Sequence, residues 1–337
     1  MNSVGADKYS LMGVREMRML AQLMVAVVTL GATLLTGGSA HAADSVRTYN
    51  VWQWNVSGWK MNGGSTTNGM VDAAAASILN RDSDFAAFNE LCWSQYKALQ
   101  DKLIQNGWVS PGTSFARFAA IRNEETPLTP EVCGGEQFGI AIFSRRNLGT
   151  ATKYELPRYS EKARYKLLCA PLEDLQHMRF CTTHITSEDS NVDGSPINEQ
   201  QLNAVQDHLE NLYDAGNTVI IAGDFNARPH LKRLNDWYSP TVNGPNNHNN
   251  TGAYRELDDL DPRCPGVGEP TTLDTLEVEE PCNDRPKIDM IFVRESLIVG
   301  AYSGDALGEG TGGTACGGGP CSDHRVLIGT VTVRVKV

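Results

Sequence analysis

The sequence TVIIAGDFN, residues 218–226, joins an apolar run to the polar residues that end it. The run from Thr218 to Ala222 predicts a buried strand that delivers Asp224. Asp224 and Asn226 are two residues apart, so an extended backbone would aim both side chains to the same side of the strand end. Asx residues after a strand are more often simple turn formers, but Gly-Asp-Phe-Asn is a more restricted string than a generic turn.

Two other polar pairs lie at the ends of apolar runs. Asn89-Glu90 ends one such run, and Asp323-His324 precedes another. Hydrolysis of a phosphoester needs a hard cation, an oriented water and a route for protons. Glu90 offers the carboxylate for such a cation, although a lone Glu at a strand end is more often a solvated residue. The three pieces together predict a metal-dependent phosphoester-cleaving site on one rim of a sheet.

Each of these polar residues has an expected role. Asp224 would deprotonate or orient the attacking water, and Asn226 would donate to a nonbridging phosphate oxygen. His324 would bind phosphate or move a proton. His184, at the end of another apolar run, would serve the opposite side of the phosphate, although a lone His there is more often structural.

Asp289 interrupts an otherwise apolar run, residues 287–293. A buried carboxylate is costly unless it is paired, so we expect it to orient His324 by accepting its ring N–H. A salt bridge to Lys287 or Arg294 is the competing interpretation.

The first 42 residues have the layout of a secretory signal peptide. Three basic residues precede an apolar run, and Ala40-His41-Ala42 supplies a cleavage site after Ala42. An uncleaved membrane anchor is the alternative, because the run approaches the length of a span. The chain is therefore expected to be secreted, with residues 43–337 forming one domain, since no linker divides them.

Charge and cysteine content constrain the exported part. The whole chain has 29 basic and 40 acidic side chains, of which three basic and two acidic ones lie in residues 1–42. Residues 43–337 therefore have 26 basic and 38 acidic side chains, a net charge of −12. This balance argues against tight nonspecific binding to DNA.

All eight cysteines lie in residues 43–337. They predict disulfides between neighbours, such as Cys169–Cys181 and Cys316–Cys321, rather than a zinc site, because no cluster has ligand spacing.

Strand and helix patterns alternate along the chain. We expect helices at residues 71–79, 95–104 and 197–213, and strands at 48–54, 85–89, 138–143, 165–170, 178–184, 218–222, 288–293 and 326–335. The strands at 138–143, 165–170 and 178–184 follow one another, which suits antiparallel pairing. The polar segment 239–286 predicts a functional surface loop or partial disorder.

Seven ordered motifs make a family resemblance visible. They are Trp54-Asn55, Asn89-Glu90, residues 138–145, Thr183-His184, residues 223–226, Ile288-Asp289 and residues 322–324. With them the chain resembles the endonuclease/exonuclease/phosphatase superfamily, which includes pancreatic-type deoxyribonuclease, apurinic endonucleases, inositol-polyphosphate phosphatases and bacterial sphingomyelinases. The resemblance implies a four-layer α/β sandwich, with two mixed β-sheets packed face to face and helices outside.

The resemblance also implies a divalent metal, Mg²⁺ with Mn²⁺ or Ca²⁺ as alternatives. Asn55, Glu90 and Asp323 would lie at this metal, and Asp289 with His324 would form the family's dyad. The nuclease-like branch further implies that Glu136 orients His184. Arg164, before a predicted strand, would contact phosphate, although a surface arginine fits it equally well.

The resemblance leaves the substrate open, because loops select what enters a shared site. A secreted DNA-cleaving nuclease is the first interpretation, so nucleic acid is the expected partner, with no obligate protein partner. A sphingomyelinase-type phospholipase C, with a phospholipid headgroup as partner, is the second, and it needs an exposed apolar hairpin. A small-molecule or lipid phosphatase is the third. A binding module without catalysis, the last alternative, fits poorly with so complete a set of acids and histidines.

Overall fold

The computed structural model describes residues 44–121, 132–160, 164–273, 281–282, 285–308, 316 and 319–337. The predicted signal peptide, residues 1–42, lies outside the described residues and stays a prediction. None of the helices in the described part of the chain is long and apolar enough to cross a membrane.

One six-stranded sheet gathers strands from the two ends of the described chain. Its order is β13-β14-β1-β2-β4-β3. The strands are β1 (Ser45–Asn55), β2 (Phe85–Cys92), β3 (Ala116–Ala120), β4 (Phe138–Ser144), β13 (Ser303–Ala306) and β14 (Leu327–Val335). β1 runs parallel to β2 and antiparallel to β14, so the described chain begins and ends on neighbouring strands.

The second six-stranded sheet is built from the middle of the chain, in the order β11-β12-β10-β7-β6-β5. Its strands are β5 (Thr152–Glu155), β6 (Lys166–Leu172), β7 (Leu175–His184), β10 (Thr218–Asp224), β11 (Tyr254–Glu256) and β12 (Asp289–Arg294). β8 (Asn191–Val192) and β9 (Ser195–Pro196) form a separate small hairpin. The short 3₁₀ turns are η1 (Val132–Gly135), η2 (Lys232–Leu234), η3 (Pro240–Val242) and η4 (Glu295–Leu297).

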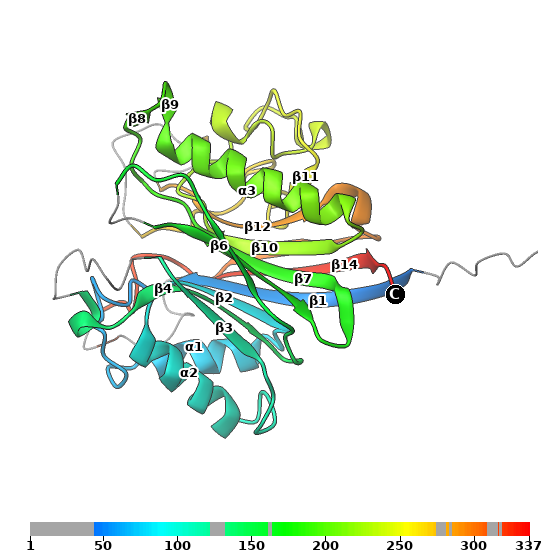
Figure 1. The fold of residues 1–337 in the computed structure, drawn as a ribbon. Helices are drawn as coiled ribbons and strands as arrows, with labels where there is room; N and C mark the ends of the chain where they lie inside the picture. Colours follow the sequence, from blue (N-terminus) through cyan, green and yellow to red (C-terminus); the bar gives the residue numbers. More distant parts are fainter. Residues whose placement is uncertain are drawn as a thin grey trace, which may run out of the picture. The chain divides into compact units, whose positions relative to one another are not determined.

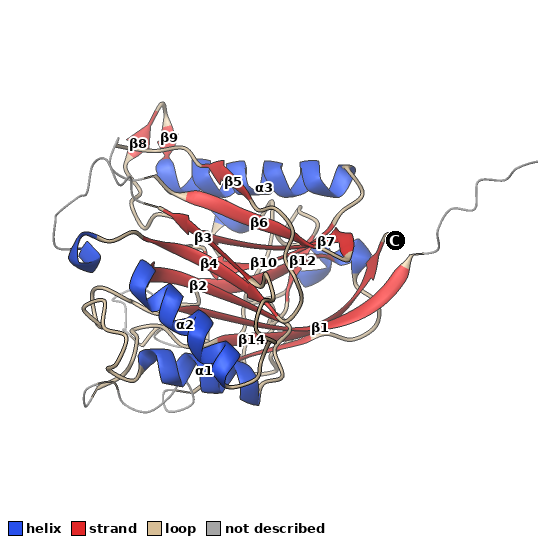
Figure 2. Ribbon diagram, turned by 60° about the horizontal axis from the view of Figure 1, so that its bottom comes forward, coloured by secondary structure: helices blue, strands red, loops and turns tan. Residues whose placement is uncertain are grey.

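Three helices cover the outer faces of the two sheets. α1 (Met70–Asn80) and α2 (Trp93–Gln105) lie on one sheet, and α3 (Ile197–Asp214) lies on the other, as Figures 1 and 2 show. Apolar residues recur at three- and four-residue spacing in α3, which buries that face of the helix. The predicted four-layer α/β sandwich is confirmed.

The core is divided into three apolar layers, one between the sheets and one under each set of helices. In β1, alternate residues belong to different layers: Tyr49 and Val51 face the second sheet, whereas Trp52 and Trp54 face α1 and α2. The Trp52 indole N–H donates to Ser77 Oγ of α1 at 3.0 Å, which satisfies its polar atom inside the apolar layer.

Strand directions bring the polar strand ends to one rim. β1 is parallel to β2 in one sheet, and β7 is parallel to β10 in the other. Hydrogen bonds from Asn55 Nδ2 to Asp224 Oδ2 at 3.0 Å and from the Asp224 amide to Asn89 Oδ1 at 2.8 Å bring the carboxyl ends of the two pairs together. β12 is antiparallel to β10 and therefore starts at that edge. In the register of the second sheet, Asp224 is paired with His184 on one side and Asp289 on the other. The rim predicted from separate motifs thus follows from the topology.

Two expectations differ from the structure. β6 and β7 pair antiparallel as predicted, but β4 lies in the other sheet, between β2 and β3. In the polar segment 239–286, residues 239–273 are described and contain packed structure: Tyr254 lies in β11, and Tyr254 and Leu257 are buried. β11 is a three-residue edge strand that pairs antiparallel with β12.

All eight cysteines are among the described residues, and they form four disulfides between sequence neighbours. The bonds are Cys92–Cys133, Cys169–Cys181, Cys264–Cys282 and Cys316–Cys321. The predicted neighbour pairing is confirmed, and no cysteine is left free to bind zinc.

Candidate active site

Gly223 allows β10 to carry Asp224 close to β7. A Cβ on Gly223 would lie 2.1 Å from the carbonyl oxygen of Thr183, which no side chain can occupy. Asp224 is 1% exposed, and its amide donates to Asn89 Oδ1 at 2.8 Å. The glycine of the Gly-Asp-Phe-Asn string is therefore required by strand contact, and the acid it precedes is held rigidly.

Asp224 lies between two histidines. Its Oδ2 atom is 3.5 Å from His184 Nε2 and 3.8 Å from His324 Nε2. The same oxygen accepts a hydrogen bond from Asn55 Nδ2 at 3.0 Å. Burial raises the pKa of Asp224, and the Asp289 charge raises it further, while both histidines and the Asn55 hydrogen bond work in the other direction. Asp224 is consequently a more basic carboxylate than an exposed one.

Asn226 reaches the rim through a turn and not through an extended backbone. Its φ angle is 44°, in the left-handed region, and its amide donates to Asp224 Oδ1 at 2.9 Å. The side-chain Nδ2 donates to Ile185 O at 2.8 Å and lies 3.3 Å from His184 Nε2. The expected alignment of Asp224 and Asn226 is present, with this local turn as its cause.

Asp289 is paired with His324. Its Oδ2 atom lies 2.8 Å from His324 Nδ1, and Asp289 is fully buried. Burial alone would lower the pKa of His324, but the Asp289 carboxylate, with help from Asp224 and Asp323, raises it to about 10. The competing salt bridges are not formed, since Lys287 pairs with Glu256 and Asp258.

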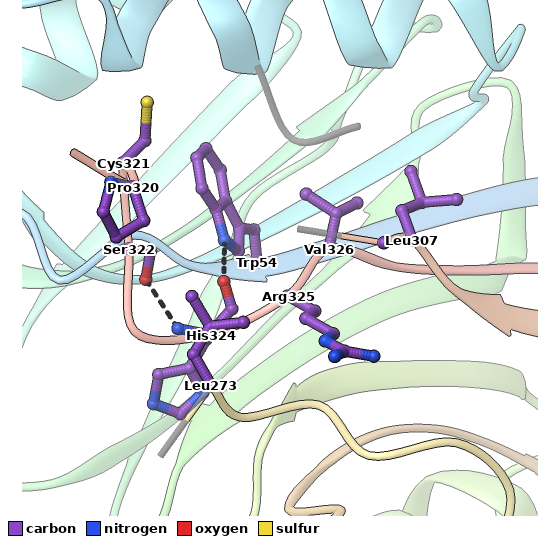
Figure 3. Close-up of a pocket in the computed structure, with 10 residues that line it drawn as sticks. Trp54, Leu273, Leu307, Pro320, Cys321, Ser322, His324, Arg325 and Val326 are labelled. Atoms are coloured by element: carbon purple, nitrogen blue, oxygen red, sulfur yellow. Dashed lines mark hydrogen bonds between the residues drawn. The ribbon is translucent and has the colours of Figure 1, made fainter. Parts of the chain in front are cut away.

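The loop that carries His324 is tied to β1. Trp54 Nε1 donates to the His324 carbonyl at 2.9 Å, and Ser322 Oγ accepts from the His324 amide at 3.0 Å, as Figure 3 shows. Ser322 Oγ also donates to Asn55 O at 2.6 Å. These bonds explain the tryptophan of Trp54-Asn55 and the serine of Ser322-Asp323-His324, which the sequence alone left without a role.

Glu90 is turned toward the rim by an irregularity in β2. The β2–β4 register shifts between Phe88 and Leu91, and the φ angle of Glu90 is 57°. The Gly58 amide donates to the Glu90 carbonyl at 2.9 Å and holds this conformation. The Glu90 carboxylate then accepts from Asn55 Nδ2 at 3.2 Å. A strained backbone that aims an acid at its neighbours is typical of a functional site.

Asp323 is paired with Lys60 rather than with another rim residue. Its Oδ2 atom accepts from Lys60 Nζ at 2.9 Å, and the Lys60 side chain is 70% exposed. Burial works to raise the pKa of Asp323, but the Lys60 hydrogen bond and the His324 charge outweigh it and lower the pKa. Asp323 therefore carries a negative charge that already attracts a cation.

The expected contact between Glu136 and His184 is not present. Glu136 is exposed and accepts from the Ser94 amide at 2.9 Å, whereas His184 Nδ1 has no hydrogen-bond partner among the described residues. The reason is local, because Glu136 follows the η1 turn and caps the start of α2. Arg164 is half-buried just before β6, and its amide donates to Ile121 O at 2.9 Å. Its role at a phosphate stays a prediction.

Residues not expected from the sequence also shape the site. The Tyr165 ring meets the His184 ring edge-on, with centroids 5.8 Å apart. Thr271 Oγ1 accepts from the Asp289 amide at 3.0 Å. Gln53 lies two residues before Asn55 on β1, and Asn89 is the register partner of Asn55 on β2. An amide on the inward face of an otherwise apolar strand was the signal that could have identified Gln53.

Several solved structures have a fold similar to that of this chain. A structure described as an endonuclease/exonuclease/phosphatase from Beutenbergia cavernae DSM 12333 is 19% identical, with 85% of this chain and 72% of that chain covered and a TM-score of 0.56. The human Nocturnin catalytic domain with bound sulfate is 15% identical, with 87% and 97% covered and a TM-score of 0.58. TDP2 from D. rerio, complexed with single-strand DNA product, is 15% identical, with 84% and 98% covered and a TM-score of 0.53.

These structures share the fold with this chain. A search of curated proteins finds no match. The model of the Endonuclease/Exonuclease/phosphatase family matches residues 52–324, a span that runs from β1 to the histidine beside Asp289 and includes all the predicted rim residues. With its fold and its sequence in agreement, the chain belongs to the endonuclease/exonuclease/phosphatase family.

Proposed function

We propose that residues 43–337 form a secreted, divalent-metal-dependent phosphodiesterase that hydrolyses DNA. The observation that carries the proposal is the position of the Asp224 carboxylate, which lies within 4 Å of a ring nitrogen of both His184 and His324. An acid between two imidazoles can take a proton from water while a histidine gives one to the leaving oxygen. Family membership limits the bond to be cleaved to a phosphate ester.

The donors on the rim fit a hard divalent cation. Glu90 and Asp323 offer carboxylate oxygens. Asn55 has an amide oxygen that accepts from the Ser57 amide at 3.0 Å, and it would have to present this oxygen to the ion in place of the Nδ2 group that now faces Glu90. Oxygen ligands are those that Mg²⁺, Mn²⁺ and Ca²⁺ prefer. Asp323 already attracts the Lys60 ammonium, and the Glu90 backbone is held so that its carboxylate faces Asn55. These three residues would hold the ion. When bound, it would neutralise phosphate charge and stabilise the charge that develops during cleavage.

Side chains of the protein would orient the water, bind the phosphate and face the leaving oxygen. Asp224, whose pKa is raised by burial, would orient the attacking water and accept its proton. His324, with a pKa of about 10, is an imidazolium at neutral pH and would attract the phosphate. His184, on the other side of Asp224, would face the leaving oxygen, and Asn226 would donate to a nonbridging oxygen once its bond to Ile185 O is exchanged.

One solved structure of the same fold supports the choice of DNA, and the Glu136–His184 contact implied by the nuclease-like branch does not contribute to it. That structure, of D. rerio TDP2, contains a single-strand DNA product. The net charge of −12 over residues 43–337 works against broad contact with a polyanion. Substrate recognition would therefore rely on the bound ion and on a short stretch of backbone near the rim.

A phospholipase C activity is the second candidate. Tyr254, the aromatic residue of the long polar segment, is 2% exposed and cannot enter a bilayer. Met61 and Trp93, however, are 38% and 39% exposed on the segments that flank Glu90. Two exposed apolar side chains, one in the turn that follows β1 and one at the start of α2 directly after β2, are the observation that favours an interfacial substrate.

One parallel assay separates the candidates. Residues 43–337 are purified and offered plasmid DNA, RNA, sphingomyelin vesicles and a panel of phosphomonoesters, with Mg²⁺, Mn²⁺ or Ca²⁺. His324→Ala is the control for a contaminating nuclease. We expect cleavage of DNA by the wild type and none by the variant. Cleavage of sphingomyelin or a monoester alone would replace DNA as substrate, and no hydrolysis of any substrate would overturn the proposal.

Export is tested separately. Expression of the full chain in a secreting bacterium should yield an extracellular product that begins at Ala43, read by N-terminal sequencing. A product that stays in the membrane fraction with an intact N-terminus would favour the anchor.

A further inference from the structure

Gln53 is a polar residue in a layer that is otherwise apolar. It follows Tyr49 and Val51 on the face of β1 that points to the second sheet, and it precedes Asn55 at the rim. Gln53 is fully buried. Its amide therefore lies one layer below the predicted metal-side residue, in the space between the two sheets.

The Gln53 amide spans two acceptors. Its Nε2 atom donates to Asp289 Oδ1 at 2.9 Å and to Asn89 Oδ1 at 3.2 Å. If the Gln53 amide were turned around, its oxygen would face Asp289 Oδ1 and Asn89 Oδ1. These two acceptors therefore fix the amide with its nitrogen toward them. Gln53 Oε1 is buried and has no hydrogen-bond partner among the described residues. An unsatisfied buried acceptor destabilises the fold, and an aliphatic side chain of the same size would avoid that cost.

Asp289 needs the donor that Gln53 provides. Its carboxylate is fully buried between the sheets, where an unpaired oxygen is costly. His324 Nδ1 lies 2.8 Å from Oδ2, and Gln53 Nε2 lies 2.9 Å from Oδ1. With a donor on each oxygen, the plane of the carboxylate is fixed. The ring of His324 takes its orientation from that plane.

Asn89 connects Gln53 to Asp224 by hydrogen bonds. Its Oδ1 atom accepts from Gln53 and from the Asp224 amide at 2.8 Å. Its Nδ2 atom donates to Thr183 O at 3.0 Å, next to His184. A continuous chain of buried hydrogen bonds thus joins Asp289, Gln53, Asn89 and Asp224, and it crosses from one sheet to the other.

We propose that Gln53 is a positioning residue, which fixes the Asp289 carboxylate against His324 and, through Asn89, sets the distance of that pair from Asp224. It touches neither the phosphate nor the metal-side residues. The catalytic consequence rests on the proposed function, while the orientation of His324 does not.

The test compares Gln53→Met with Val51→Ala. Methionine keeps the length and volume of glutamine but lacks the donor, so packing is largely retained. Val51→Ala removes apolar volume from the same face of the same strand, one layer away, and leaves the hydrogen bonds in place. Gln53→Leu is the second variant if Gln53→Met does not fold by circular dichroism.

Two measurements are made on each protein. The first is steady-state hydrolysis of the best substrate. We expect kcat of Gln53→Met to fall about 10- to 100-fold, with KM unchanged. This is the range seen when a group that orients a functional side chain by a hydrogen bond is removed. The second is the downfield ¹H NMR signal of the His324 ring N–H bonded to Asp289, assigned by its loss in His324→Ala. It should shift or disappear in Gln53→Met and persist in Val51→Ala.

The two measurements separate failure of this inference from failure of the proposed function. Wild-type kcat and an unshifted signal in Gln53→Met overturn the positioning role. An equal loss of kcat and signal in Val51→Ala also overturns it, because general packing would then be the cause. If the wild type hydrolyses no phosphate ester, the proposed function fails, and the ring N–H signal alone decides the role of Gln53.

Discussion

The interaction between His324 and Asp289 gives a prediction whose size follows from the structure. The pKa of His324 rises from 6.5 to about 10, although burial alone would lower it. That difference corresponds to about 5 kcal/mol in favour of the imidazolium, at about 1.4 kcal/mol for each tenfold change in proton affinity. Asp289, at 2.8 Å, is the largest contributor that raises the pKa, ahead of Asp224 and Asp323.

Asp289→Asn replaces this carboxylate with a neutral amide of the same shape. Burial then remains while its main opponent is gone, so we expect the pKa of His324 to fall well below 10, although Asp224 and Asp323 still raise it. More of the ring would then be neutral at pH 8, and hydrolysis at that pH should drop about 100- to 1,000-fold, as expected for loss of a positioned group that stabilises phosphate charge.

Stability has a matching pH dependence. The pKa of His324 is higher in the folded protein than in the unfolded chain. Its contribution to the free energy of unfolding is therefore fully present below about pH 6.5 and is lost as the pH rises through about 10. Thermal melts of the wild type should show this loss across that window, and those of Asp289→Asn should not.

NMR titration of selectively labelled histidine measures the pKa directly. The His324 resonance is assigned with His324→Ala, and the wild type is compared with Asp289→Asn in metal-free buffer. A wild-type His324 that titrates near 6.5, or a variant that still titrates near 10, would refute the reasoning.

Three further predictions use other parts of the site. Asp224→Asn should lower kcat about 100- to 10,000-fold yet leave the melting temperature unchanged or higher, because burial disfavours its charge; a wild-type rate would remove Asp224 from the mechanism. EDTA should stop hydrolysis and Mg²⁺, Mn²⁺ or Ca²⁺ should restore it, so full activity after exhaustive chelation would exclude a metal. The double variant Cys316→Ser/Cys321→Ser should fold with a loss of about 2 kcal/mol and turn over more slowly, because the bond stiffens the loop before His324; unchanged turnover would contradict this.

The strands that carry the predicted site residues were predictable because their apolar runs are long and end in polar residues. The strand at 218–222 was expected and extends to Asp224 in the structure, and the neighbouring glycine is explained by the approach of Thr183. The expectation missed edge strands such as β3 and β13. Edge strands are short and half-exposed, so they carry little of the hydrophobic periodicity that identifies a central strand.

The structure brings most of the predicted rim residues close together, but the sequence did not predict many of their contacts. Glu90 and Asn226 both lie in left-handed conformations, which no pattern of alternating residues signals. Glu136 was assigned by resemblance alone, and the structure gives it to the Ser94 amide instead. Long-range partners such as Gln53 and Asp289 depend on how two sheets dock, and a linear sequence does not encode that distance in any local pattern.

The position of β14 has a consequence for the newly made chain. β1, which carries Asn55, has β14 as one of its two neighbours, although the two strands lie far apart in the sequence. His324 lies just before β14 and is paired with Asp289. During synthesis, a nascent chain that has not yet reached His324 and β14 therefore leaves β1 without one of its two partner strands and Asp289 without its imidazole, so the rim is completed late in synthesis.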